Sequence, residues 1–598
     1  MKVTRAGSRR KLCFGDKEIT EQHEAPKSCF FRILKYSRMV FLTFDEVQQV
    51  CIFALMIRIL TAILLPLLLS SCTYYIGPNH WANSFSKDEV IVPHRTSVEE
   101  IATDDVLLAY ESLEKKSSKK IHQYSAKFED TTINVRTAYV KLLLAVDIEA
   151  VNQAILKTKA WGTTGTSGKL NKRGDYDFSQ IQFTHLIWYF KDSPHLLYPE
   201  TAQHIVDYLI IDNGARPTLK APKTLGIVRE TENHILMKEA SRYLKNQWIF
   251  ENNPQAEFDN TQNGMTDFLI EHLLEMKKTG FYEFNSNPYI SYTFEALHIL
   301  HMHSKDQEIK QVCKEVMDAE NYAYALGSFE LKKYSPFRRR MTRVTTSSLF
   351  GDRHGVLIRA ELAKSNKKVL QEDQLPCCFD RTLISSASDY ILPEETQHLI
   401  EKKSQNYYAK IGHGLKASPE IYYGTPDYLL TGGGLRIGKR SQIVPRPLSI
   451  LLKDEANDIK QCFHIEGKGK LNKWNNTGLY PNIMIGENQV YIPKEYARID
   501  SFKIWDIYKP YPNKDIYICV YNGRNLGIIF MGQSNYQEIL SLNLSDKQLS
   551  RAFNLSASNT ISYKTAARKK WVIKTTPSGR PQRKFKRWKR FNVNYESN

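Results

Sequence analysis

The sequence lacks the short motifs that identify the commonest catalytic and metal sites. It contains no HExxH, no GxSxG, no Walker motif and no zinc-finger spacing, so metalloproteases, nucleophile-elbow hydrolases, phosphate-loop enzymes and zinc modules gain no support. Its nine cysteines include no CxxC pair, which argues against a disulfide scaffold and against a thiolate metal centre. We therefore expect neither a metal ion nor a cofactor.

Acidic residues are missing from the stretch between Lys564 and Arg590, which holds 12 Lys and Arg. Residues 1–71 contribute a further +5, so only +2 of the net charge of +19 belongs to the rest of the chain. Basic tails of this kind bind polyanions without sequence specificity, and a solvated tail with no partner is the alternative. Because the central region is nearly neutral, we expect no specific nucleic-acid partner.

One apolar run stands out, although it is short for a membrane span. "MIRILTAILLPLLLSSC", Met56 to Cys72, has a basic start at Arg58, an apolar core and an ending that resembles the bacterial lipobox. This resemblance implies that Cys72 carries lipid and anchors the mature protein in the bacterial cell envelope. Thr73 follows the cysteine, which by resemblance to Gram-negative sorting favours the outer membrane.

The 55 residues before Met56 do not fit a signal peptide. The simplest hypothesis is that translation starts at Met56 and that residues 1–55 are a misassigned start. The alternative keeps residues 1–55 as a cytoplasmic extension and uses residues 47–71 as an uncleaved anchor, with Arg58 placed at a cost inside the span.

The remainder divides into a helical region followed by a β region. We interpret residues 72–97 as a polar tether, 98–415 as helical, 416–563 as antiparallel β and 564–598 as the basic tail. Apolar residues at steps of three and four predict helices, of which the clearest cover residues 133–156, 183–190, 200–211, 231–250, 265–278, 293–304, 306–320 and 393–408. Many consecutive helices of similar length favour a helical-hairpin toroid or a solenoid, and the lack of an exact repeat argues against a tetratricopeptide-type array.

The pattern changes after about residue 420. "EIYYGTPDYLLTGGG" and "DIYICVYNGRNLGIIFM" are rich in β-branched and aromatic residues, which are typical of strands. Asn522-Gly523 lies between two such runs and predicts a β-hairpin. The order of elements therefore predicts a multidomain α+β chain.

Three polar clusters occur where a loop enters a helix. The first is "RETENH", in which Thr231 is a candidate N-cap and Arg229, Glu232 and Asn233 project close to the apolar face of the following helix, whereas His234 does not. The second is "GFYEFNSNPYISY", with Glu283 as a candidate acid or base, Tyr289 as a candidate proton donor, and Asn285 and Tyr292 beside them. The third is "KRGDYDF", which contains Asp175 and Asp177.

The order of elements and these clusters resemble the toroid-plus-β-sandwich polysaccharide lyases of the heparinase and chondroitinase type, and more broadly the six-hairpin glycosidases. The resemblance implies an (α/α) helical toroid followed by an antiparallel β-sandwich-like domain. It also implies eliminative cleavage of an acidic polysaccharide, in which Asn233 would neutralise the uronate carboxylate and His234 would remove the C5 proton. Trp188 and His413 are expected to line the cleft, with His354 and His413 reaching it from the β side.

Two alternatives stay open. Hydrolysis on the same scaffold would use Glu232 and Glu283 together with the Asp175/Asp177 pair, because glycosidases need two facing carboxyl groups. A non-catalytic envelope lipoprotein that binds glycan or protein would instead use the clusters for helix capping and core packing. These readings differ in whether the first two clusters face one cavity.

Overall fold

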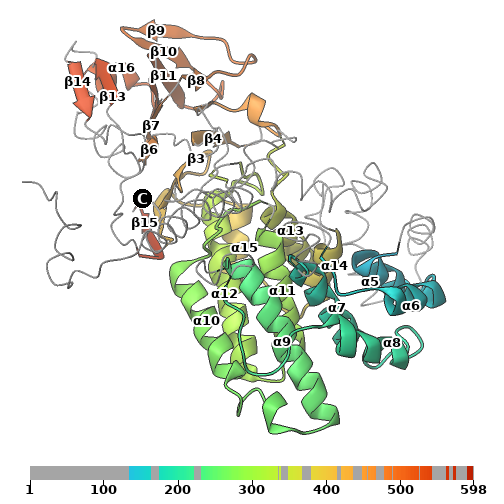
Figure 1. Cartoon of the computed structure of the whole chain (residues 1–598). Coiled ribbons are helices and arrows are strands. Elements are labelled where there is room, and N and C mark those ends of the chain that lie inside the picture. Colours follow the sequence, from blue (N-terminus) through green and yellow to red (C-terminus); the bar gives the residue numbers. More distant parts are fainter. Residues whose placement is uncertain are drawn as a thin grey trace, which may run out of the picture. The chain divides into compact units, whose positions relative to one another are not determined.

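Helices come first and strands follow in the chain, so the protein is a mixed α+β protein (Figure 1). All described residues belong to one compact unit, Ser71–Asn598. Among these residues, no helix is both long and apolar enough to cross a membrane. The signal-like segment and Cys72 lie outside the described residues. The computed structural model describes residues 133–162, 174–220, 230–287, 289–334, 336–337, 348–365, 379–413, 419–434, 448–453, 456–465, 477–487, 489–523, 526–541, 561–564, 570–573 and 589–596.

The helical part is built around α9, which contacts α7, α10 and α11 (Figure 1). Helix α11 packs against both α9 and α12, and α9 also packs against α7. The helices are α5 (Val135–Leu143), α6 (Ile148–Lys157), α7 (Asp177–Tyr189), α8 (Pro199–His204), the π-helix η2 (Ile205–Leu209), α9 (Glu232–Asn252), the 3₁₀ turn η3 (Ala256–Phe258), α10 (Met265–Thr279), α11 (Ile290–His303), α12 (Gln307–Gly327), α13 (Arg353–Ser365), α14 (Phe379–Ala387) and α15 (Glu394–Glu401).

The helix expected over residues 133–156 is divided into α5 and α6. Ala145 and Asp147 between them have φ angles of 55° and 49°, in the left-handed region that non-glycine residues seldom adopt. Lys141, which is buried, donates a hydrogen bond of 2.5 Å to the Asp147 carboxylate across this break. The apolar spacing continues through the break, so the periodicity alone did not reveal it.

The strands form two large antiparallel sheets and one short pair. The first sheet has the order β15-β1-β2-β3-β4-β5-β8, the second β6-β7-β12-β11-β10-β9, and β13 pairs with β14. The elements of this part are β1 (Tyr407–Ile411), β2 (Glu420–Gly424), β3 (Tyr428–Gly433), β4 (Leu448–Leu452), η5 (Ile459–Gln461), β5 (His464–Ile465), β6 (Thr477–Tyr480), β7 (Ile483–Glu487), β8 (Val490–Tyr491), β9 (Asp500–Phe502), β10 (Trp505–Tyr508), β11 (Tyr517–Gly523), β12 (Leu526–Gly532), α16 (Tyr536–Ser541), β13 (Ile561–Lys564), β14 (Lys570–Ile573) and β15 (Phe591–Tyr595).

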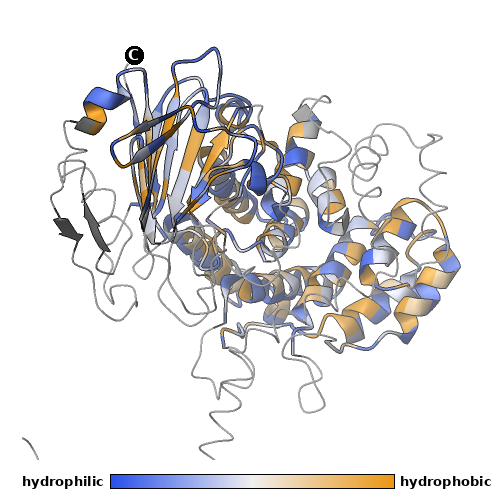
Figure 2. Ribbon diagram, turned by 90° about the horizontal axis from the view of Figure 1, so that it is seen from above, coloured by the Kyte–Doolittle hydropathy of each residue, from blue (hydrophilic) through white to orange (hydrophobic). Residues whose placement is uncertain are grey.

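Both faces of the first sheet are buried. Tyr422 on β2 belongs to a core cluster that includes Leu326 of α12, so this face packs against the helices. Its strand neighbours Ile421 and Tyr423 belong to a second cluster shared with the other sheet. Successive side chains on a strand point to opposite faces, so both faces need apolar residues and the strands read as continuous apolar runs. In Figure 2 the strands carry orange, apolar stretches beside white and blue ones.

The observed β region is larger than the sequence indicated. Helix α15 ends at Glu401 and strand β1 begins at Tyr407, inside the region assigned to helix. Residues 591–595, assigned to the basic tail, pair with β1 as the edge strand β15. Residues 354–359, expected on the β side, lie in helix α13. The predicted hairpin is present as β11 and β12, but Asn522 and Gly523, which were expected between the strands, are the last residues of β11 and pair with Gly527 and Leu526.

Candidate functional site

The first polar cluster occupies the first turn of α9. Thr231 is the N-cap residue with an extended backbone, as expected, but its side chain makes no capping hydrogen bond. Its hydroxyl instead donates to Oδ1 of Asn233. Glu232, Asn233 and His234 are all buried, because α9 is covered by neighbouring helices along most of its length. Arg229 lies outside the described residues.

His234 pairs with Asp177 at the start of α7. The imidazole Nδ1 lies 2.6 Å from Oδ2 of Asp177, and both side chains are buried. Burial alone would lower the pKa of His234, but the carboxylates of Asp177, Glu230 and Asp175 raise it to about 9. Burial raises the pKa of Asp177, whereas the nearby His234 lowers it, and the net effect is a lowered pKa. His234 is therefore protonated at neutral pH, a state that does not suit the role of proton acceptor.

The first and second clusters meet in the structure. The carboxylate of Glu232 accepts a hydrogen bond of 2.7 Å from the backbone N–H of Glu283. Glu283 belongs to the turn that leads into α11, so this contact ties the entry of α9 to the entry of α11. The contact is enclosed, since Glu232 is 8% exposed and Glu283 2% exposed. We refer to Asp177, Glu232, His234 and Glu283 as the inner cluster.

Of the remaining aromatic residues predicted for the site, Tyr289 and Tyr292 lie at the start of α11, whereas Trp188 lies near the end of α7. Tyr292 on α11 accepts a hydrogen bond of 2.9 Å from Arg136, and the guanidinium of Arg381 lies 4.1 Å from its ring centre. Tyr289, the N-cap residue of α11, is buried. Trp188 on α7 donates to the carbonyl of Leu244 and packs in the helical core. Asp175 is buried in the turn before α7.

A second group of predicted residues converges between the helices and the first sheet. Asn285, in the turn before α11, donates to Oε2 of Glu420 on β2 and accepts a hydrogen bond of 3.1 Å from Lys333. His413 lies 2.5 Å from the other oxygen of Glu420, and the Tyr422 hydroxyl also donates to Glu420. We refer to Asn285, Lys333, His413, Glu420 and Tyr422 as the junction cluster.

The charge state of the junction cluster follows from its contacts. Burial opposes the ionisation of Glu420, but the hydrogen bond and charge of His413, aided by Lys333, lower its pKa to about 2. Burial and the nearby Glu420 carboxylate raise the pKa of Tyr422 well above its usual value, so the phenol keeps its proton. Because Glu420 is a carboxylate, Nε2 of His413 donates to it. In the neutral form of the ring Nδ1 is then the acceptor nitrogen, and it faces the guanidinium of Arg590.

Neighbouring residues fix the orientation of His413. Its ring stacks on Phe284 with the ring centres 3.6 Å apart, and Nη1 of Arg590 lies 3.5 Å from Nδ1. Arg590 also pairs with Glu320 of α12. Gly280 approaches this assembly with φ of 69°, and a Cβ there would lie 2.8 Å from the Arg590 guanidinium carbon. The close approach therefore requires glycine.

Sequence reasoning found Asn285 and His413 but missed Lys333, Glu420, Tyr422 and Arg590. Glu420 and Tyr422 are two residues apart on β2, so both point toward the helices. A lone carboxylate in the run "EIYYG", whose other residues are apolar or glycine, was the available signal. His354, expected beside His413, instead lies on α13 and contacts Asn321 at 2.8 Å.

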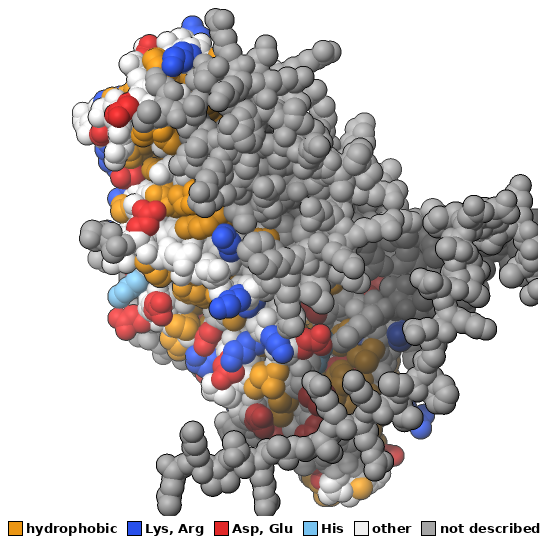
Figure 3. All heavy atoms as spheres, turned by 90° about the vertical axis from the view of Figure 1, so that its left-hand side faces the viewer, with side chains coloured by type: hydrophobic (Ala, Val, Ile, Leu, Met, Phe, Trp, Pro, Cys, Tyr) orange, Lys and Arg blue, Asp and Glu red, His pale blue; other side chains and the backbone are white. Residues whose placement is uncertain are grey.

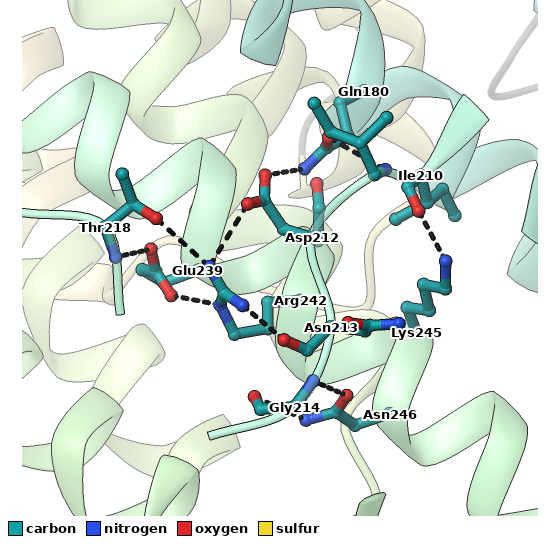
Figure 4. A network of polar contacts seen from close by, with 12 residues as sticks. Gln180, Ile210, Asp212, Asn213, Gly214, Thr218, Glu239, Arg242, Lys245 and Asn246 are labelled. Atoms are coloured by element: carbon teal, nitrogen blue, oxygen red, sulfur yellow. Dashed lines mark hydrogen bonds and ion pairs between the residues drawn. The ribbon is translucent and has the colours of Figure 1, made fainter. Parts of the chain in front are cut away.

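A third polar network stabilises the chain between η2 and α9 (Figure 4). Arg242 on α9 pairs with Glu239 and Asp212 and donates to Thr218 and to the carbonyl of Asn213. Lys245 and Asn246 bind further backbone groups of the same segment. The residues labelled in Figure 4 come from α7, from the segment that follows η2 and from α9. Their interactions hold these parts together, so we assign the network a structural role.

The described residues include no group of three or more His, Cys, Asp or Glu that could hold a metal ion. On the face in Figure 3, Lys and Arg are interspersed with Asp and Glu. No family model matches the chain, and neither a curated protein nor a solved structure matches it. The inner cluster and the junction cluster are therefore the features that bear on function.

Proposed function

We propose that this chain is an exported, lipid-anchored enzyme that cleaves an acidic polysaccharide by elimination, with the junction cluster as its site. The single observation that carries the proposal is the convergence of an amide, an imidazole and a protonated phenol on Glu420. Anchoring through Cys72, with the outer membrane as its place, is part of the same proposal.

The three groups match the three demands of elimination. Asn285 and the cation Lys333 would neutralise the uronate carboxylate, which makes the C5 proton more acidic. His413 Nδ1 would accept that proton, held in place by Glu420 and Phe284. Tyr422 would protonate the departing O4 oxygen while the C4–C5 double bond forms. Asn285, which is half-buried, is the member of this set nearest to solvent.

The architecture supports the same proposal at a coarser level. The helical part precedes two sheets that share one core cluster, as a β-sandwich-like domain would. We propose that the helices belong to an (α/α) toroid and that the acidic chain binds where the helices meet the first sheet. The junction cluster draws residues from both parts, because Asn285 precedes α11 and Glu420 lies on β2.

A non-catalytic glycan-binding lipoprotein is the second candidate, and one observation favours it. The inner cluster, which combines most of the predicted catalytic residues, is enclosed, with His234 4% and Asp177 3% exposed. The junction cluster is equally enclosed, with His413 3% and Glu420 2% exposed. Buried, paired charges of this kind serve structure in many proteins. Hydrolysis gains no comparable support, since Asp177 is engaged by His234 and Glu232 by the Glu283 backbone.

The test is a screen of uronic-acid polymers for the ultraviolet absorbance of an unsaturated product. Alginate, hyaluronan, chondroitin sulfate, heparin and polygalacturonate would be incubated with the mature protein and with Asn285→Ala, His413→Ala and His398→Ala. His398 is a matched control, because its side chain is 71% exposed on α15. We expect the first two changes to lower the rate by about 10²-fold or more, and His398→Ala to leave it unchanged. No unsaturated product from any polymer, or equal rates in all variants, overturns the proposal.

A further inference from the structure

A pocket lies on the helical part, away from both clusters. It has a volume of about 540 Å³, within the range of ligand-binding pockets, and is formed by the end of α7, the loop after it, α8, η2 and the end of α9. Apolar side chains of α7 and α8 form part of its lining. The groups that determine its chemistry are Lys191, Gln203, Asp207, Trp248, Asn252 and Asn253.

Trp248 supplies an aromatic surface in this pocket. Its side chain is half-buried, and its ring meets Trp188 edge to face, with ring centres 5.4 Å apart and an interplanar angle of 86°. This contact holds the orientation of the indole from the core side. A fixed, partly exposed indole presents a broad apolar surface at small entropic cost.

The charge of the pocket is balanced. Lys191 pairs with Glu251 at 2.8 Å and lies 5.9 Å from the Trp248 ring centre, so its charge is already compensated. Asp207 accepts a hydrogen bond of 2.9 Å from Gln203, and both are exposed at the rim with Asn252. The rim therefore offers carboxylate and amide groups but no uncompensated cation. This composition suits a neutral ligand with many hydroxyl groups better than an anion.

The backbone is also unusual at this place. Helix α8 passes into the π-helix η2, and Ile210 N–H donates to the Ile205 carbonyl five residues earlier, at 2.8 Å. Val206 and Asp207 of this turn line the pocket. Single π-helical turns cost stability and occur frequently at functional sites. This geometry is independent of the aromatic and charge arguments.

We propose that this pocket binds a neutral pyranose unit of a glycan, with the apolar face of the sugar stacked on Trp248 and its hydroxyls bound by Asp207, Gln203 and Asn252. The site goes beyond the proposed elimination, which concerns an acidic chain at the junction cluster. A hydroxyl donates to the Asp207 carboxylate, whereas a uronate would be repelled by it. The pocket is thus a separate carbohydrate-binding site on the same molecule.

The test measures binding by calorimetry and by tryptophan fluorescence, with the mature protein and neutral hexasaccharides derived from cellulose, starch, xylan, mannan and chitin. We expect at least one to bind, and Trp248→Ala to weaken its binding about tenfold or more. Trp161→Ala is the matched control. Trp161 is 47% exposed and its ring centre lies 5.0 Å from the Lys159 ammonium, but it does not line the pocket. Gln203→Ala, at an exposed position, gives a second variant that leaves the core intact, and we expect it to weaken binding several-fold.

Any of three results overturns this proposal. Either no neutral hexasaccharide binds the folded protein, or the Trp248→Ala and Trp161→Ala variants bind it equally well. The third is that an acidic hexasaccharide binds more tightly than every neutral one and that this binding depends on Trp248. Cleavage is assayed separately. Product formation without Trp248-dependent binding would support elimination and refute the carbohydrate-binding pocket. Trp248-dependent binding without product formation would support the pocket and refute elimination.

Discussion

The ion pair between His234 and Asp177 makes stability depend on pH in a defined window. The pKa of His234 rises from 6.5 to about 9 in the folded protein, which corresponds to about 3 kcal/mol. A raised histidine pKa contributes fully below the unfolded value, so the whole contribution is present below pH 6.5. It is lost as the pH rises through about 9.

Asp177→Asn removes the charge that chiefly raises this pKa. We expect the variant to be less stable than the wild type by about 3 kcal/mol near pH 6, because a buried imidazolium loses its partner. The difference should shrink toward pH 9, where the wild type has also lost the proton. Urea unfolding followed by far-ultraviolet circular dichroism at about pH 6, 7.5 and 9 measures both effects.

Asp212→Asn is the matched control for this experiment. Asp212 pairs with Arg242 at 3.1 Å, and a guanidinium does not titrate in this range, so the stability lost there should be the same at each pH. A loss for Asp177→Asn that is equally large at pH 6 and pH 9 would refute the reasoning, since it would mean that His234 does not change charge in the window.

Two further changes test the packing. Arg242→Ala leaves Glu239 and Asp212 without their shared cation, so we expect the free energy of unfolding to fall by about 3–5 kcal/mol in the same assay. Arg242→Lys should recover only part of this loss, because an ammonium group lacks the forked donor geometry of the guanidinium. Gly424→Ala would place a Cβ 2.3 Å from the Tyr407 ring, so we expect a loss of about 1–3 kcal/mol in the free energy of unfolding. Gly486→Ala should cost less, because the nearest neighbour of its Cβ would lie at 3.1 Å. Equal losses in the two variants would contradict the packing argument.

The helices and the hairpin were predictable because they depend on local signals. Apolar spacing placed α9 to within two residues, and the two β-branched and aromatic runs indicated the hairpin of β11 and β12, although Asn522-Gly523 ends β11 instead of separating the strands. The break between α5 and α6 was not predictable, since it depends on left-handed geometry at Ala145, a residue type that seldom adopts it, as well as at Asp147. The end of the helical region was also missed, because short apolar strands such as β1 resemble helix segments.

The candidate site was only partly predictable, because its partners are distant in the sequence. Asn285 and His413 were singled out individually, yet their connection runs through Glu420 and depends on how β2 packs against the helices. The helical wheel separated His234 from the apolar side of α9 on the assumption that one side faces water. Helix α9 is instead covered on most sides, so His234 is buried as well and finds its charge partner in α7.

The edge of the first sheet sets an order of events during synthesis. Strand β1 pairs with β2 on one side and with β15 on the other, yet β15 consists of residues 591–595. Until the ribosome has produced those residues, β1 presents unpaired backbone groups, and an open edge is a template for pairing with other chains. Completion of the sheet is therefore a late step. Premature termination before residue 590 would produce a chain that is prone to aggregation and that also lacks Arg590 beside His413.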